Sequence, residues 1–108
     1  MDKDNAIILT KKFVEKVKQN HIDVLDAWIF GSYAKGNHNN NSDIDLALVL
    51  PENSISFDTD VRLMALRKGK ETMIETHTYS QYDFSTNIPI VEQIKRFGYQ
   101  LLPSNNPQ

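Results

Sequence analysis

Apolar residues recur every three or four positions in three stretches of the chain, and each stretch predicts an amphipathic helix with one face toward a core. The first stripe, in a helix over roughly residues 5–20, consists of Ala6, Leu9, Phe13 and Val17. The second, in a helix over about 58–68, consists of Phe57, Val61, Met64, Ala65 and Lys68. The third, in a helix that Pro89 begins and Gly98 ends, consists of Ile90, Ile94 and Phe97.

The ends of the first two helices carry recognisable capping residues. Asp4 or Asn5 is placed to cap the first helix, and Asp58 or Thr59 the second, because their side-chain oxygens accept hydrogen bonds from free amides of a first turn. Gly69 is expected to end the second helix, since glycine readily adopts the backbone conformation that follows a last turn.

Shorter runs of bulky and β-branched residues predict strands. These runs are 24–30, ending before Gly31; 43–50, stopped by Pro51; 72–79; and 99–102, as a short edge strand. Between them, 32–35 is expected to open a short helix and 81–84 to form a turn or a helical turn.

The order helix, strand, strand, helix, strand, helix predicts an α/β (α+β) fold, a small mixed β-sheet flanked by helices. About ten residues join the first two strands, which permits an antiparallel pair. A chain of 108 residues has room for one domain, expected over residues 1–102. Residues 103–108 offer little apolar surface and are expected to form a disordered tail.

Composition narrows the class of protein. The net charge of −2 gives no overall basic field, so the sequence carries no strong nucleic-acid signal. There is no cysteine, which excludes disulfides, thiolate metal sites and cysteine nucleophiles. The N-terminus has no leader-like pattern and no apolar run approaches a membrane span, so we expect a cytoplasmic protein without membrane contact.

Strand alternation brings acidic side chains together. Asp43 and Asp45 share one face of their strand with Ala47 and Val49, and Glu75 shares a face of the later strand with His77. The intervening helix returns the chain to the sheet, so Glu75 can lie beside the two aspartates. Burial of Glu75 without a partner would cost several kcal/mol, which a metal ion would offset. Two or three converging carboxylates suit Mg²⁺ in two-metal phosphoryl chemistry.

A glycine turn precedes the aspartates. Gly31, at a strand-to-helix junction, lets the backbone come close to a ligand, and the following amides with the Ser32 hydroxyl can donate to phosphate oxygens. Lys35 can reach a phosphate from the same turn.

Each feature also has a purely structural interpretation. Gly31 and Ser32 fit a tight turn with a helix cap, Lys35 an exposed position, and a lone Asp-x-Asp a solvated strand end. Glu75 and His77 fit the wet face of an edge strand. His77 is expected at the surface or behind a ligand rather than bound directly to metal. His38, in an asparagine-rich loop, is expected to be solvated.

Together, Gly31-Ser32-Tyr33-Ala34-Lys35-Gly36, a spacer and Ser42-Asp43-Ile44-Asp45-Leu46 resemble the signature of the polymerase beta-like nucleotidyltransferase superfamily, and most closely its minimal nucleotidyltransferase (MNT) domains. The match continues more loosely through Ile74-Glu75-Thr76-His77, Tyr82-Asp83-Phe84 and the helix ending at Gly98, and so covers most of residues 24–102.

The resemblance implies the polymerase beta-like fold and a magnesium-dependent transfer of a nucleoside monophosphate from an NTP, most simply AMP from ATP, to a hydroxyl. Two Mg²⁺ ions, or Mn²⁺, would be bound by Asp43, Asp45 and Glu75, which are also the catalytic residues. Gly31, Ser32, Lys35 and Ser42 would bind the nucleotide phosphates. Many relatives carry Asp where this chain has Glu75, which is one methylene longer.

The resemblance also implies a partner. MNT domains are often paired with a HEPN-domain protein in toxin–antitoxin modules, where the MNT protein neutralises the ribonuclease and in some cases adenylylates it. A second copy of the chain, in a homodimer, would be another partner. Three hypotheses of different classes therefore stand. The first is an active nucleotidyltransferase, and the second is a catalytically weak or inactive MNT-fold module that neutralises a partner by contact alone. The third is a structural domain in which the acids bind a stabilising cation but no nucleotide.

Overall fold

The computed structural model describes residues 1–102 and contains one four-stranded mixed sheet. The strands are β1 (Asp26–Phe30), β2 (Ile44–Leu50), β3 (Ile74–Ser80) and β4 (Tyr99–Leu102), in the order β3-β2-β1-β4. β1 pairs antiparallel with β2 and with β4, while β2 and β3 are parallel. The predicted mixed sheet, the antiparallel first pair and the edge position of 99–102 are confirmed.

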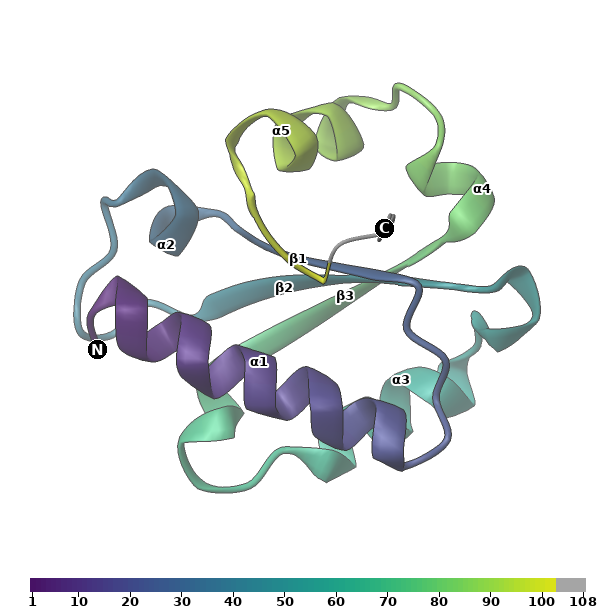
Figure 1. Cartoon of the computed structure of the whole chain (residues 1–108), viewed down its shortest axis with the longest axis horizontal. Coiled ribbons are helices and arrows are strands. Elements are labelled where there is room, and N and C mark those ends of the chain that lie inside the picture. Colours follow the sequence, from purple (N-terminus) through teal and green to yellow (C-terminus); the bar gives the residue numbers. More distant parts are fainter. Residues whose placement is uncertain (103–108) are drawn as a thin grey trace, which may run out of the picture.

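Helices cover the sheet on both sides (Figure 1). α1 (Lys3–Gln19) and α3 (Phe57–Leu66) lie on one face, and α4 (Gln81–Phe84) and α5 (Pro89–Phe97) on the other. α2 (Ser32–Lys35) stands at the end of β1, and two 3₁₀ turns, Glu52–Ser54 and Gly69–Met73, flank α3. Pro89 begins α5 as predicted, since the first helical position needs no amide hydrogen.

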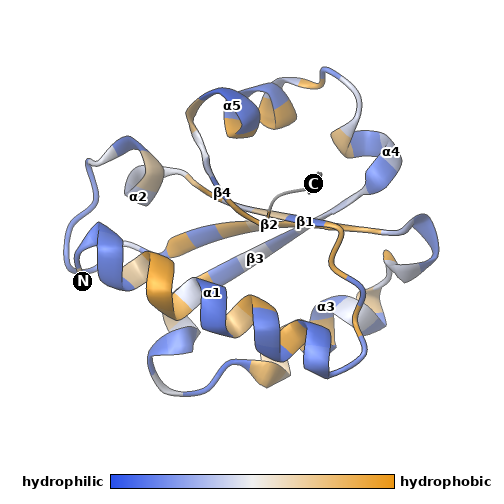
Figure 2. Ribbon diagram, in the orientation of Figure 1, coloured by the Kyte–Doolittle hydropathy of each residue, from blue (hydrophilic) through white to orange (hydrophobic). Residues whose placement is uncertain are grey.

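β2 is central and buries side chains on both faces. Ile44, Leu46 and Leu48 pack with the buried residues of α1, whereas Ala47 and Val49 pack with Phe84 and residues of α5. This alternation agrees with the predicted faces of β2. Figure 2 shows hydrophobic and hydrophilic residues alternating along α1, as an amphipathic helix on a sheet requires.

The predicted helix caps are wrong by two or three positions. Asp2 caps α1, because its Oδ1 accepts the amide of Asn5 at 2.8 Å, and Ser56 caps α3 by accepting the amide of Thr59 at 3.1 Å. The caps Asp4 or Asn5 and Asp58 or Thr59 lie inside the first turns instead. An N-cap oxygen reaches the amide two or three residues downstream, so each cap must precede the helix.

The end of α3 also differs from the prediction. α3 ends at Leu66 rather than at Gly69, and 72–73 belong to the second 3₁₀ turn rather than to a strand. Arg67 leaves the helix and donates from its guanidinium to the carbonyl oxygens of Thr72 and Ile74, at 3.2 and 2.8 Å. Those bonds hold the turn against the start of β3.

Two of the three predicted core stripes are misplaced. On α3 the buried residues are Thr59 and Leu63, and the predicted stripe is exposed, with Phe57 at 80%, Val61 at 45% and Met64 at 59%. On α5 the buried residues are Val91 and Ile94, so Ile94 is confirmed, while Ile90 and Phe97 are 43% and 47% exposed. On α3 the predicted stripe and the buried residues lie on different sides of the helix, and the sheet covers only one of them. On α5 the buried face includes Ile94 but is turned toward Val91, which leaves Ile90 and Phe97 at its edge.

β4 follows α5 after a close approach at Gly98. The Gly98 amide donates to Ile94 O at 2.7 Å, and a Cβ at this position would lie 3.0 Å from Ile29 O and 3.2 Å from the ring of Trp28. The absence of a side chain therefore lets the end of α5 turn directly into the strand that pairs with β1.

Within residues 1–102, no helix has the length and apolar character needed to cross a membrane. The predicted disordered tail, 103–108, lies outside the described residues.

A carboxylate links α1 to the turn before β3. Glu71 Oε1 accepts hydrogen bonds from the Lys16 ammonium and from the Lys68 amide, and its side chain is 13% exposed. Lys16 also donates to Leu66 O at 2.9 Å, at the end of α3. Burial alone would raise the pKa of Glu71. The hydrogen bonds from Lys16 and Lys68 and the charge of Lys16 lower it by more, so the pKa of Glu71 lies below its ordinary value.

We expect Glu71→Gln to lower the free energy of unfolding by about 1–2 kcal/mol near neutral pH, because it removes a charge-assisted pair. The folded pKa of Glu71 is below the unfolded value of 4.5, so its stabilisation is complete above that value and is lost as the pH falls through the folded pKa. Urea unfolding of both proteins, repeated at decreasing pH, should show the difference shrinking.

Glu15→Gln is the matched control, since Glu15 is 62% exposed and lies 3.5 Å from Lys18. It should change stability by about 0.5 kcal/mol or less. A Glu71→Gln deficit that does not change between neutral and acidic pH would contradict the assigned role.

Candidate active site

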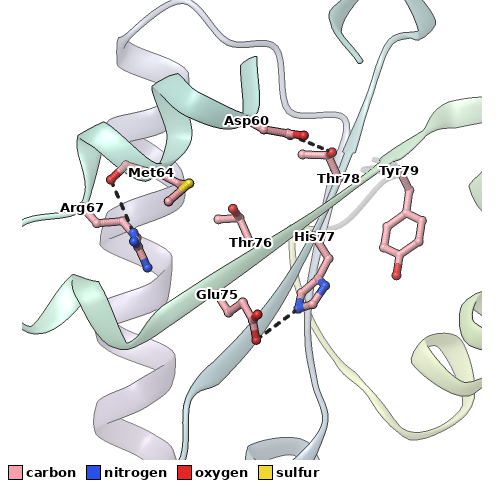
Figure 3. A pocket seen from close by; sticks show the side chains of 8 residues that line it. All are labelled: Asp60, Met64, Arg67, Glu75, Thr76, His77, Thr78 and Tyr79. Atoms are coloured by element: carbon pink, nitrogen blue, oxygen red, sulfur yellow. Dashed lines mark hydrogen bonds and ion pairs between the residues drawn. The ribbon is translucent and has the colours of Figure 1, made fainter. Parts of the chain in front are cut away.

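The pairing of β2 with β3 brings the predicted acids together. In the parallel register Asp45 is the partner of Glu75, so both side chains leave the same face of the sheet. β3 therefore lies beside β2, as expected from the helix that returns the chain. His77 follows on the same face, and Figure 3 shows the Glu75 and His77 side chains directed toward each other.

Asp45, Glu75 and His77 form a compact group. Each offers one ligand atom, and these atoms lie within 4.8 Å of one another. His77 Nε2 is 3.2 Å from Asp45 Oδ1 and 3.7 Å from Glu75 Oε1. The side chains of Asp45 and His77 are 27% and 34% exposed, so solvent and a ligand can reach the group.

Glu75 is more exposed than the sequence argument assumed. Its side chain is 58% exposed on an edge strand, so the supposed cost of burying an unpaired carboxylate does not apply. Glu75 faces solvent, as the edge-strand interpretation predicts. It also lies beside Asp45, as the prediction of a shared metal site requires.

Gly31 makes room for Asp45. Its φ of +75° and ψ of −148° are unfavourable for other residues, and a Cβ there would collide with Oδ2 of Asp45. The register explains the approach, since Phe30, the preceding residue, is the antiparallel partner of Asp45. The sequence predicted that the backbone at Gly31 comes close to a ligand. In the structure the group that lies close to this backbone is the Asp45 carboxylate.

The short helix after Gly31 is confirmed and is anchored by an aromatic stack. α2 runs from Ser32 to Lys35 and is capped by Gly36, which has a φ of +81°. Tyr33 is fully buried and stacks on His38, with ring centroids 4.0 Å apart and planes at 14°. The expectation that His38 is solvated is therefore wrong, because the ring packs against Tyr33, a core residue of α2 five positions earlier.

The remaining predicted site residues are Asp43, Ser42 and Lys35. Asp43 is exposed just before β2, and its carboxylate is not part of the ligand-atom group found among residues 1–102. The Ser42 hydroxyl accepts the Asn39 amide at 2.9 Å and so shapes the loop. Lys35 is exposed, with its ammonium 6.0 Å from the ring centroid of Phe97.

Sequence reasoning missed two aromatic neighbours of the group. The Phe30 ring meets His77 edge-on, with centroids 5.1 Å apart. Burial, and then the charge of Asp45, raise the pKa of the Tyr79 phenol above its ordinary value. Tyr79 could have been found from the sequence, since it shares the alternating face of Glu75 and His77. The position of Phe30 could not, because it depends on the pairing of β1 with β2.

A groove of about 590 Å³ runs along β3 beside this group (Figure 3). Its lining residues are Glu75, Thr76, His77, Thr78 and Tyr79 from β3 and Asp60, Met64 and Arg67 from α3. The Thr78 hydroxyl donates to Asp60 Oδ1 at 3.0 Å and ties the two walls together. The groove gives a second molecule access to Glu75.

The group has the chemistry of a divalent-cation site. Two carboxylate oxygens suit Mg²⁺ or Mn²⁺, and the imidazole nitrogen suits transition metals, so Mn²⁺ fits the whole donor set. With His77 as a hydrogen-bond partner of Asp45, the two carboxylates remain for Mg²⁺.

The nucleotidyltransferase domain family matches residues 10–101, and the chain belongs to that family. The resemblance to polymerase beta-like nucleotidyltransferases is thereby confirmed.

Two solved structures share the fold. A candidate nucleotidyltransferase from Sulfolobus solfataricus has 21% identity and a TM-score of 0.59, covering 74% of this chain and 71% of that one. The crystal structure of a toxin–antitoxin with AMP-PNP has 20% identity and a TM-score of 0.62, covering 85% of this chain and 72% of that one. No curated protein matches the chain.

We expect Gly31→Ala to weaken Mn²⁺ binding by about tenfold or more, because a Cβ would displace the Asp45 carboxylate. The unfavourable φ should also lower the free energy of unfolding by about 1–2 kcal/mol. Electron paramagnetic resonance of Mn²⁺ and urea unfolding measure the two effects.

Gly36→Ala is the matched control, because Gly36 also has a positive φ but no atom lies within 4 Å of a Cβ there. It should lose about 1 kcal/mol of stability, as expected for an alanine in the left-handed region, and bind Mn²⁺ as the wild type does. Equal loss of Mn²⁺ binding in both variants would show that backbone strain, not the contact with Asp45, is responsible.

Proposed function

We propose that this domain is a magnesium-dependent nucleotidyltransferase that moves an NMP group, AMP from ATP, to a hydroxyl of a partner protein. The observation that carries the proposal is the pairing of Asp45 with Glu75 across two adjacent strands, beside a glycine that contacts Asp45. Membership of the nucleotidyltransferase family supports the reaction class.

Asp45 and Glu75 hold the metal ions in this proposal, and Asp43 joins them from the loop before β2. Bound Mg²⁺ would neutralise phosphate charge and make the acceptor hydroxyl more acidic. The acceptor oxygen forms a bond to the α-phosphorus as the bond to the bridging oxygen breaks and pyrophosphate leaves. Glu75, exposed in the groove along β3, takes the proton of the acceptor hydroxyl.

His77 is a positioning residue in this scheme. Its Nε2 lies within hydrogen-bond distance of Asp45 Oδ1, and its ring is held by Phe30. It therefore fixes the orientation of the Asp45 carboxylate, as imidazoles commonly do next to metal ligands.

The triphosphate lies against the turn from Gly31 to Lys35. Gly31 has no side chain to block the approach, and Ser32 opens α2 with its hydroxyl and amide near that point. Lys35 supplies positive charge one helical turn away, and Ser42 lies in the loop that leads to Asp43.

The partner we propose is a HEPN-domain toxin, with this chain as its antitoxin. The similarity of the fold to the solved toxin–antitoxin with AMP-PNP supports this assignment. The groove along β3 would admit the acceptor hydroxyl of that partner to Glu75. A second copy of the chain is the other partner to examine, because β3 and β4 are both sheet edges.

One observation favours a second candidate function. The Asp43 carboxylate is not gathered with Asp45, Glu75 and His77, and the third acid is a glutamate. A domain with an incompletely assembled metal site would act as a binding module that neutralises its partner by contact alone.

Incubation with ATP labelled at the α-phosphate, Mg²⁺ or Mn²⁺ and the protein encoded next to this chain should label that protein. Glu75→Gln should reduce transfer by about a hundredfold or more, since it removes a metal ligand and proton acceptor. Glu75→Asp should retain transfer, because the charge remains one methylene further back.

Asp23→Asn, an exposed carboxylate between α1 and β1, is the matched control and should label normally. Absence of label on the neighbouring protein and on a panel of other acceptors would count against transferase activity.

The two candidate functions differ in the Asp43→Asn, Asp45→Asn double variant. If transfer is the means of neutralisation, the variant should fold, bind the partner and leave its toxicity intact in a growth assay. The matched control is Asp58→Asn with Asp23→Asn, which removes two exposed carboxylates elsewhere. Full neutralisation by the folded double variant would establish the contact-only function instead.

A further inference from the structure

A second cleft is lined in part by Gly31. It has a volume of about 250 Å³ and lies between the end of β1, α2 and α5. Its lining residues are Phe30, Gly31, Lys35, Ile90, Gln93 and Phe97. This feature, which we call the base cleft, is separate from the groove along β3 but shares Gly31 with the Asp45 contact.

The base cleft accounts for apolar residues that the core does not use. Ile90 and Phe97 flank the buried Ile94 on the edge of the core-facing stripe of α5 and are 43% and 47% exposed. They nevertheless line one concave wall together with Phe30. Exposed apolar side chains gathered around a hollow, rather than scattered, are typical of a ligand site.

The polar residues of the cleft are few and differ in kind. Lys35 lines it and places its ammonium 6.0 Å from the Phe97 ring centroid, and Arg96 lies 5.4 Å from the same centroid. Gln93 contributes a neutral amide, which can donate and accept hydrogen bonds at once. The aromatic surface matches the ring of a nucleobase, the amide matches its polar edge, and the nearby cations match the phosphates of a nucleotide.

We propose that the base cleft holds the nucleobase of the NTP, with the ring stacked on Phe97 and its polar edge read by Gln93. This inference rests on the proposed nucleotidyltransferase function. Base stacking on aromatic side chains is favourable for any base, whereas an amide can pair with the edge of only some of them. Phe97 is thus assigned to affinity and Gln93 to nucleotide choice.

Size and position agree with this assignment. The cleft is smaller than the roughly 300–1,000 Å³ that holds a drug-sized molecule, so it suits one heterocycle rather than a whole nucleotide. Gly31 lines the cleft and is also in contact with the Asp45 carboxylate. A nucleotide can therefore place its base in the cleft and its phosphates at the metal-binding group, with the ribose between them.

Calorimetry with ATP and with inorganic tripolyphosphate, each with Mg²⁺, separates the contribution of the base from that of the phosphates. Wild-type protein should bind ATP about tenfold or more tightly than tripolyphosphate. Phe97→Ala should weaken ATP binding by about tenfold to a hundredfold and leave tripolyphosphate binding unchanged. Phe57→Ala is the matched control, since Phe57 is 80% exposed on α3, across the sheet.

The role of Gln93 is tested with ATP, GTP, CTP and UTP. Gln93→Leu should narrow the spread of their dissociation constants by about fivefold or more, because the edge-reading amide is lost. An unchanged spread would overturn the assignment of nucleotide choice to Gln93. Because Gln93 and Phe97 are both exposed on α5, each variant should unfold at the wild-type denaturant midpoint.

The outcomes distinguish this inference from the function on which it rests. Wild-type protein that binds tripolyphosphate and ATP equally, or Phe97→Ala that binds ATP normally, would overturn the base cleft and leave nucleotidyl transfer intact. Wild-type protein that binds neither compound would overturn the proposed function and the cleft together.

Discussion

The contact between the Asp45 carboxylate and the Gly31 backbone is the constraint on which the rest of the site depends. Asp45 is paired on both sides, with Phe30 in the antiparallel direction and with Glu75 in the parallel one. Those two registers bring the glycine turn, the second acid and His77 to one carboxylate. A shift of one residue in either register would turn Asp45 or its partner to the opposite face and disperse the group.

The position of the acids at the start of their strands keeps the free-energy cost of their charge low. β2 is buried along nearly its whole length, and only its beginning, at Asp45, is partly open. Farther along the strand the same face carries Ala47 and Val49, packed against residues of α4 and α5. Charge therefore stands where the helical layer ends, and apolar contacts begin two residues later. Full burial of the carboxylates would cost far more, because an unpaired buried charge is expensive.

Local sequence patterns correctly predicted structural features that depend on neighbouring residues. They failed for features that are set by contacts between residues distant in the chain. Alternation correctly placed Asp45 with Ala47 and Glu75 with His77, because a strand has a fixed period of two. The α3 stripe was assigned wrongly, since Thr59 with Leu63 and Phe57 with Val61 have the same spacing and only the sheet selects between them. The sequence motif likewise predicted that Gly31 matters, but its contact with Asp45 needs the β1–β2 register, which no local pattern contains.

The direct turn from α5 into β4 at Gly98 has a thermodynamic consequence. α5 is joined to the sheet at each end, through α4 after β3 and through β4 beside β1. β4 is a four-residue edge strand, and such strands separate from a sheet at low free-energy cost. The helix that forms one wall of the base cleft is thus joined directly to the shortest strand of the sheet. A ligand that needs that wall must shift the opening equilibrium of β4, so occupancy and amide hydrogen exchange in 99–102 are linked quantities.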